Sequence, residues 1–199
     1  MMLLGLLALF AVAAFIFSKK RQKTETQPQM ASMNFIKCTV AKFMLTDVDT
    51  TQQIAPLFEN LGNHSFTIST SAKKAQTFFD QGLRLTYAFN HAEAHRSFME
   101  AARLDPDAAM TFWGQAYTLG PNINDPLPDD ERKMNAFKAL QRAQKVADKA
   151  SPKEQALIKA LASRYSDDMG KDITELNMAY MEAMAEVVKQ FTDDADVQT

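Results

Sequence analysis

Between residues 75 and 106, small and bulky apolar residues recur at helical spacing in the run AQTFFDQGLRLTYAFNHAEAHRSFMEAARLDP. Two faces repeat every three or four residues: Phe78, Gly82 and Leu85 on the first, and Ala94, Phe98 and Ala101 on the second. Residues at this spacing share one side of an α-helix. Asn90 and His91 separate the faces, and Pro106 ends the second helix because its ring clashes with a continuing helix. The run predicts two antiparallel helices packed as a hairpin, with Gly82 at their closest approach.

The apolar spacing after Pro106 predicts further helices. The boundaries that we expect are Ser71, as N-cap, to Phe89; His91 to Leu104; Asp107, as N-cap, to Leu119; Asp129 or Asp130 to about residue 149; Ser151 to Tyr165; and Ile173 to Phe191. Three prolines exclude helix from 120–128, whereas Ser151 to Glu154 form a capping box. Residues 193–199 resemble a helix start that is too short to continue. The chain is therefore predicted to be all-α, with hairpins at about 72–106, 107–149 and 151–192.

The order of the signature residues in the first hairpin resembles the tetratricopeptide repeat. These residues are Phe78, Gly82, Leu85, Ala94, Phe98, Ala101 and Pro106. The sequence departs from the repeat at Gln81, where an apolar residue is expected. From residue 55 onward, the chain is similar to the N-terminal part of a poorly characterised family of bacterial tetratricopeptide proteins. The resemblance implies an α-solenoid, truncated at its C-terminus, with residues 55–71 as a cap that places Phe58, Phe66 and Ile68 on the first hairpin.

In tetratricopeptide arrays the first helix of each repeat lines a concave groove, and this implies where a peptide binds. The corresponding residues here are Gln76, Phe79, Leu83 and Thr86. Phe79 and Leu83 stand where other repeats use lysine and asparagine to hold a carboxylate, so an apolar segment of another protein is the expected partner. The alternative for both residues is packing against the cap or a neighbouring helix.

Residues 1–18 begin with seventeen uncharged residues, MMLLGLLALFAVAAFIF, and are followed by Lys19, Lys20 and Arg21. A helix of this length is roughly 25 Å long, close to the ~30 Å hydrocarbon layer. Basic residues after the apolar run predict a single-pass membrane anchor with the repeats in the cytoplasm. The alternatives are a signal peptide cleaved near Ala13, with export to the periplasm, and a misassigned start. Residues 19–54 are predicted to be a basic and polar tether of uncertain structure.

Charge and cysteine content narrow the function classes. The net charge is −2, and residues 1–34 hold four basic residues against Glu25, a net +3, which leaves −5 for residues 35–199. Nucleic-acid binding relies on clustered Lys and Arg, so an acidic body argues against it. The basic cluster after the apolar run suits anionic lipid head groups. The single Cys38 excludes an intrachain disulfide, and it lacks the surroundings of a reactive thiol.

Candidate catalytic and metal-binding patterns are incomplete in this sequence. His91 and His95 lie four apart, but a metalloprotease motif needs glutamate directly after the first histidine. Ala94 and Phe98 define the buried side, so both histidines are expected at its edge or in solvent. The methionines at 178, 181 and 184 could bind copper(I), yet they are expected to be adaptable core residues.

These observations favour a membrane-tethered, helical-repeat scaffold for protein–protein interaction, with no cofactor, metal or catalytic residue. Two alternatives stay open. The first is a truncated or structural remnant of a longer array without independent binding. The second is a metal-dependent enzyme.

Overall fold

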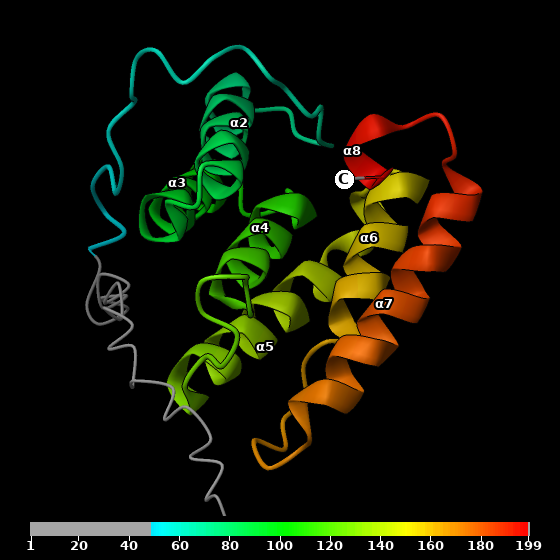
Figure 1. Cartoon of the computed structure of the whole chain (residues 1–199). Coiled ribbons are helices and arrows are strands. Elements are labelled where there is room, and N and C mark those ends of the chain that lie inside the picture. The colour runs from blue at the N-terminus through cyan, green and yellow to red at the C-terminus, as the bar shows by residue number, and fades with distance from the viewer. Residues whose placement is uncertain (1–48, 199) are drawn as a thin grey trace, which may run out of the picture. The chain divides into compact units, whose positions relative to one another are not determined.

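The computed structural model describes residues 49–198, and all regular elements within them are helices, without a β-strand (Figure 1). The elements are α2 (Lys73–Tyr87), α3 (His91–Leu104), α4 (Ala109–Leu119), α5 (Asp130–Lys145), the 3-10 turn η1 (Ala147–Lys149), α6 (Pro152–Ala162), α7 (Ile173–Gln190) and α8 (Ala195–Gln198). The predicted all-α class is confirmed for this part of the chain. The predicted anchor 1–18, Cys38 and most of the tether 19–54 lie outside the described residues. Within 49–198, no helix is both long and apolar enough to span a bilayer.

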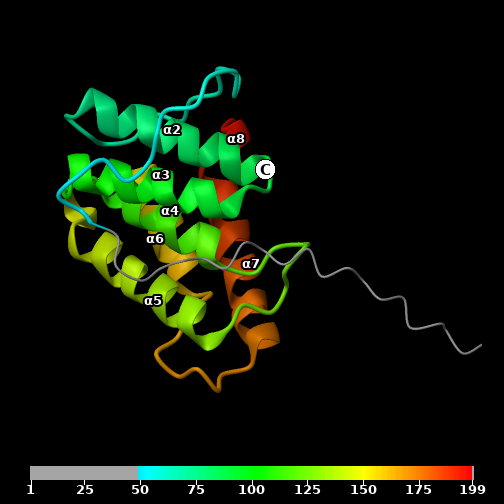
Figure 2. The same cartoon turned by 90° about the vertical axis from the view of Figure 1, so that its left-hand side faces the viewer.

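The helices pack as consecutive antiparallel pairs. α2 packs on α3, α4 on α5, and α6 on α7, and each later pair contacts the one before it through α4 and α6. Figure 2 shows this order, with α2 and α3 above α4 and with α5 below. The pairs coincide with the three hairpins expected from the sequence.

Phe98 is the side chain around which the first three helices meet. It is fully buried, and its ring centroid lies 5.3 Å from that of Phe79. A Cβ atom added at Gly82 would lie 2.8 Å from the Phe98 ring, and one added at Gly114 would lie closer still. Gly82 is the predicted point of closest approach, whereas Gly114 of α4 was not singled out by the sequence. The remaining apolar signature residues are also buried: Phe78, Leu85, Ala94 and Ala101.

Two of the predicted N-caps are wrong. Ala72 precedes α2 and Ala108 precedes α4, and neither offers a side-chain oxygen to the helix. The Asp107 carboxylate instead pairs with Lys149 at 2.9 Å, which ties the start of α4 to the end of the α5 hairpin. At Ser71, the preceding Thr70 takes over the local bonding, since its hydroxyl accepts from the Ala72 N–H at 3.1 Å.

The caps of the second half of the chain agree with the sequence. The Asp129 carboxylate accepts from the Arg132 N–H at 2.8 Å at the start of α5. Ser151 and Glu154 form the predicted capping box, with Pro152 in the first turn of α6. α6 ends at Ala162 rather than Tyr165, and α8 forms where the sequence predicted no completed helix.

His95 is buried, contrary to the expectation that it lies at the edge of α3. Its Nδ1 atom lies 3.3 Å from the Thr118 hydroxyl because α4 packs across that side of α3. Burial lowers the pKa of His95 to about 4, from an ordinary 6.5. The folded protein therefore holds this imidazole neutral at pH values where an unfolded chain would protonate it.

We expect His95 to make the protein less stable as the pH falls from 6.5 to about 4. In this range the unfolded chain binds a proton that the folded chain does not, so protonation favours unfolding. Each pKa unit corresponds to ~1.4 kcal/mol, and the total loss is on the order of 3 kcal/mol. Urea unfolding of parent and His95→Gln at pH 7, 5.5 and 4.5 measures it. As the pH falls, the free energy of unfolding should decrease more in the parent than in His95→Gln. An equal decrease in both proteins would show that His95 does not cause the loss.

A glutamine explains the departure from the repeat pattern. Gln81 is buried, and its side-chain amide donates to the Pro56 carbonyl at 2.9 Å and accepts from the Phe58 N–H at 2.8 Å. Its amide nitrogen also donates to the Ser97 hydroxyl at 3.0 Å. An apolar residue here would leave these backbone groups unpaired. Gln81 therefore fastens the chain before α2 to the α2–α3 hairpin.

Gln76 forms a second amide pairing of the same kind, one and a half turns earlier on α2. Its amide donates to the Phe66 carbonyl at 2.9 Å and accepts from the Ile68 N–H at 2.9 Å. In both cases one glutamine binds the C=O of one residue and the N–H two residues later, as a neighbouring strand would. We call residues 54–70, which these amides hold in a non-helical conformation, the N-terminal segment.

Buried carboxylates hold the rest of the N-terminal segment. Glu100 of α3 accepts from the Ile54 N–H at 2.8 Å, and Asp80 of α2 accepts from the Ser65 hydroxyl at 2.8 Å. Glu154 of α6 accepts from the Ser69 N–H at 2.7 Å and from the Ser69 hydroxyl. The segment thus connects the neighbouring helices α2 and α3 to α6, which lies far from them in sequence. The cap prediction places Phe66 and Ile68 correctly, since both are buried, but it is wrong for Phe58, which is 42% exposed.

Candidate binding cavity

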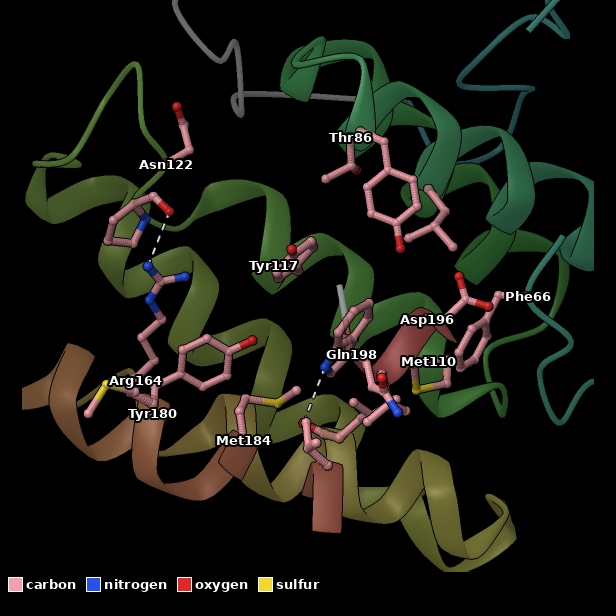
Figure 3. A pocket seen from close by; sticks show the side chains of 18 of the residues that line it. Phe66, Thr86, Met110, Tyr117, Asn122, Arg164, Tyr180, Met184, Asp196 and Gln198 are labelled. Atoms are coloured by element: carbon pink, nitrogen blue, oxygen red, sulfur yellow. Dashed lines mark hydrogen bonds between the residues drawn. The ribbon is translucent and has the colours of Figure 1, made fainter. Parts of the chain in front are cut away.

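A cavity of about 760 Å³ opens between α2, α4, α6, α7 and α8 (Figure 3). We call it the central cavity. Most of its wall is aromatic, aliphatic or methionine side chains: Phe66, Phe79, Leu83, Tyr87, Met110, Trp113, Tyr117, Leu157, Tyr180, Met181, Met184, Val188 and Val197. Pockets that hold small ligands or peptide side chains have volumes of roughly 300–1,000 Å³ and mostly apolar walls. The size and lining of the central cavity therefore suit an apolar ligand.

The structure brings three of the four sequence-predicted binding residues to the central cavity. Phe79, Leu83 and Thr86 of α2 line it, and all three are buried. Phe79 also contacts the Phe98 ring, so it supports the core as well as the wall. Gln76 does not line the cavity, because its amide is used by the N-terminal segment. Residues on this face of α2 therefore both pack in the core and line the central cavity.

The wall formed by α4 is aromatic and is tied to α6. Trp113 and Tyr117 stack with ring centroids 4.9 Å apart and 12° between their planes. The Trp113 indole N–H donates to the Leu157 carbonyl of α6 at 3.2 Å. The stacked rings, with the indole N–H group satisfied, present a flat apolar surface to the cavity.

The opposite wall comes from α7 and is more open. Met181 is 61% exposed although it lines the cavity, and Met178, one turn earlier, is 53% exposed and lies outside it. The expectation that the methionines at 178, 181 and 184 are core residues is wrong for Met178 and Met181, whereas Met184 is partly buried and packs against the core. Sequence analysis did not identify this wall, although Tyr180 and Met184 lie four residues apart and share a helix face.

Three phenol groups supply polar positions inside the apolar wall. The pKa values of Tyr87 and Tyr180 are raised to about 12, and that of Tyr117 is raised as well, in each case chiefly because burial disfavours the phenolate. These side chains are therefore neutral near pH 7. Within residues 49–198 the three hydroxyl groups make no hydrogen bond to protein, so they can donate to a ligand.

Arg164 lies at one end of the central cavity, together with Tyr180 (Figure 3). Its Nε atom donates to the Asn177 side chain at 2.9 Å, and Nη2 donates to the Pro121 carbonyl at 3.2 Å. The guanidinium lies 5.0 Å from the centre of the Tyr180 ring. These contacts fix the cation in place, and no carboxylate of the described residues forms an ion pair with it.

Residues around α8 form the other end of the cavity. Asp196, Val197 and Gln198 line it, and Val197 is only 3% exposed. Lys153 of α6 pairs with Asp194 at 2.6 Å, just before α8 begins. Asp196 and Phe66 are both labelled at this end of the cavity in Figure 3. A short C-terminal helix thus closes the end of the cavity opposite Arg164.

The two histidines of α3 do not form a metal site with each other. His91 lines the central cavity, where burial lowers its pKa, whereas His95 lies against Thr118 in the core. In the part of the chain that the structure describes, no three His, Cys, Asp or Glu side chains gather closely enough to hold a metal ion.

No protein-family model matches the chain, and no curated protein or solved structure matches it either. Its function is therefore argued from the central cavity itself.

Proposed function

We propose that the chain is a non-catalytic scaffold of the tetratricopeptide type that binds an apolar segment of another protein in the central cavity. One observation carries the proposal: α2 and α4, the first helices of two successive hairpins, present Phe79, Leu83 and Tyr117 to the same cavity. In tetratricopeptide arrays the first helices line the binding groove, and this is the face that the resemblance assigns to a peptide. The apolar run 1–18 would tether the scaffold to a membrane, with the repeats in the cytoplasm.

The lining of the cavity determines the kind of segment that fits. Burying one aliphatic or aromatic side chain contributes ~1.5–3 kcal/mol. A micromolar complex needs ~8 kcal/mol beyond the entropy lost on association, so several such side chains must enter. The neutral phenols of Tyr87, Tyr117 and Tyr180 can bond the backbone of that segment, which explains polar groups in an otherwise apolar wall.

A matched pair of methionine variants tests this proposal. Peptides are first selected for binding from a random twelve-residue library, and their affinities are then measured by calorimetry. Met181→Asp should weaken binding about tenfold or more, because it puts a charge into the cavity wall. Met178→Asp, on the same helix and similarly exposed, should leave affinity unchanged.

Either of two results would count against the proposal. If both variants bind the selected peptide with equal affinity, the peptide binds outside the central cavity. Failure to select any peptide would favour the alternative that the chain is a structural remnant without its own binding activity. Phe79→Asp does not serve as a test, because Phe79 is fully buried and its loss would disturb the core.

A further inference from the structure

The residues around α8 close one end of the central cavity, and their side chains make contacts there that a bound peptide could also make. Val197 projects into the apolar end and is 3% exposed, although its helix is only four residues long. Two aspartates on the same stretch meet basic side chains on the rim. Asp194 pairs with Lys153 at 2.6 Å, and Asp196 Oδ1 lies 2.8 Å from His64 Nε2. We call residues 194–197 the tail segment.

The partners of the tail segment come from distant parts of the chain. Lys153 belongs to α6, and its ammonium group also lies 4.2 Å above the centre of the Phe66 ring. His64 belongs to the N-terminal segment, and its ring centroid lies 5.8 Å from that of Tyr87 at the end of α2. Two groups that can carry positive charge therefore flank an apolar end of the cavity. This arrangement complements a segment that has both acidic and aliphatic residues.

We propose that the tail segment is a built-in occupant of the apolar end of the central cavity. The external ligand is then a peptide segment with acidic and aliphatic residues that displaces the tail segment. The inference rests on the proposed function and adds the chemistry of the ligand. The ligand places a carboxylate on Lys153, another beside His64, and an aliphatic side chain where Val197 lies. Its remaining residues fill the open part of the cavity toward Tyr117, Tyr180 and Met184.

The tail segment is held weakly enough to be displaced. A helix of four residues has no stability of its own, because helix formation becomes favourable only over much longer lengths. Its two ion pairs are partly exposed to solvent, and such pairs contribute little. Its advantage is its covalent connection, which keeps its local concentration high. A ligand that also fills the open part of the cavity can overcome that advantage.

Val197→Asp in the full-length chain provides the test. The charge should expel the tail segment from the apolar end and leave the groove accessible. The probe is a fluorescein-labelled peptide with the sequence of residues 192–199, TDDADVQT, added in trans and followed by anisotropy. It should bind Val197→Asp at least about tenfold more tightly than it binds the parent, whose groove is occupied. The same peptide with aspartate in place of valine should not bind.

A second substitution, made in the Val197→Asp background, assigns the rim contacts. Lys153→Glu should weaken the probe by roughly threefold to fivefold, because it replaces the partner of Asp194 by a like charge at a partly exposed position. Lys159→Glu, on the exposed side of the same helix, should have no effect. Circular dichroism checks that both variants remain folded. If Val197→Asp unfolds, Asp194→Lys replaces it, since that change repels Lys153 without touching the apolar end.

The inference is overturned if the probe binds parent and Val197→Asp equally, if it binds neither, or if Lys153→Glu and Lys159→Glu behave alike. The proposed function is still supported after any of these results if Met181→Asp weakens the binding of library-selected peptides. Loss of that response would reject the proposed function itself.

Discussion

Gly114→Leu should lower the free energy of unfolding by about 3 kcal/mol, and Gly82→Leu by ~1–3 kcal/mol. Both glycines face the fully buried Phe98 ring, and a Cβ atom at either position would overlap it. Leucine is a better helix former than glycine by up to ~1 kcal/mol, but this gain is smaller than the cost of overpacking. The ring cannot retreat, because α2 lies on one side of it and α4 on the other.

Urea unfolding of the two leucine variants measures this effect. Gly170→Ala is the control, since Gly170 is exposed and its added Cβ would meet a single Asp168 oxygen at 3.3 Å. The control should change stability by less than ~0.5 kcal/mol. Unchanged midpoints for Gly82→Leu and Gly114→Leu would show that the Phe98 ring does not lie between these helices.

Glu154→Ala should cost about 3 kcal/mol or more and detach the N-terminal segment from α6. Glu154 is buried and accepts from the Ser69 N–H at 2.7 Å and the Ser151 N–H at 2.6 Å, besides the Ser69 hydroxyl. Hydrogen bonds to a charged group contribute ~1.5–3 kcal/mol each, and removing the acceptor leaves buried donors unpaired. The loss should therefore exceed that of an ordinary surface substitution.

Thermal unfolding and amide hydrogen exchange report the two parts of this prediction. In Glu154→Ala, the Ile68 and Ser69 amides should exchange faster, while amides of α3 keep their relative protection. Glu175→Ala is the control, because Glu175 is exposed and its ion pair with Lys171, at 3.8 Å, lies on the surface and contributes little to stability. If both variants unfold at the parent temperature, Glu154 does not hold the segment.

Local signals in the sequence were sufficient where a side chain acts on its own helix. The capping box at Ser151 and Glu154 and the proline-rich loop 120–128 depend on neighbouring residues, and the structure agrees with both predictions. The predictions were wrong or incomplete where contacts with an element distant in sequence determine the position of a side chain. Glu154 also binds Ser69 across the fold, and His95 is buried because α4 covers it, and neither contact leaves a local sequence pattern.

The candidate site shows the same division. Phe79, Leu83 and Thr86 share a helix face, so their common position on the cavity wall follows from spacing. Gln76 shares that face, but its amide is taken by the N-terminal segment, whose path the spacing does not reveal. The α7 wall and the tail segment depend on how α7 and α8 fold back toward α2. Val187 and Val197 are buried by tertiary contacts in this arrangement, and the spacing of apolar residues along the chain does not predict those contacts.

Methyl NMR of the methionines tests the central claim most directly. Met110, Met181 and Met184 line the central cavity, whereas Met178 lies on α7 outside it. A full-length sample labelled at the methionine methyl groups is titrated with a library-selected peptide. The account predicts that the signals of Met110, Met181 and Met184 shift together along one binding curve while the Met178 signal stays in place. Shifts at Met178 with unchanged signals from the three cavity methionines would contradict it.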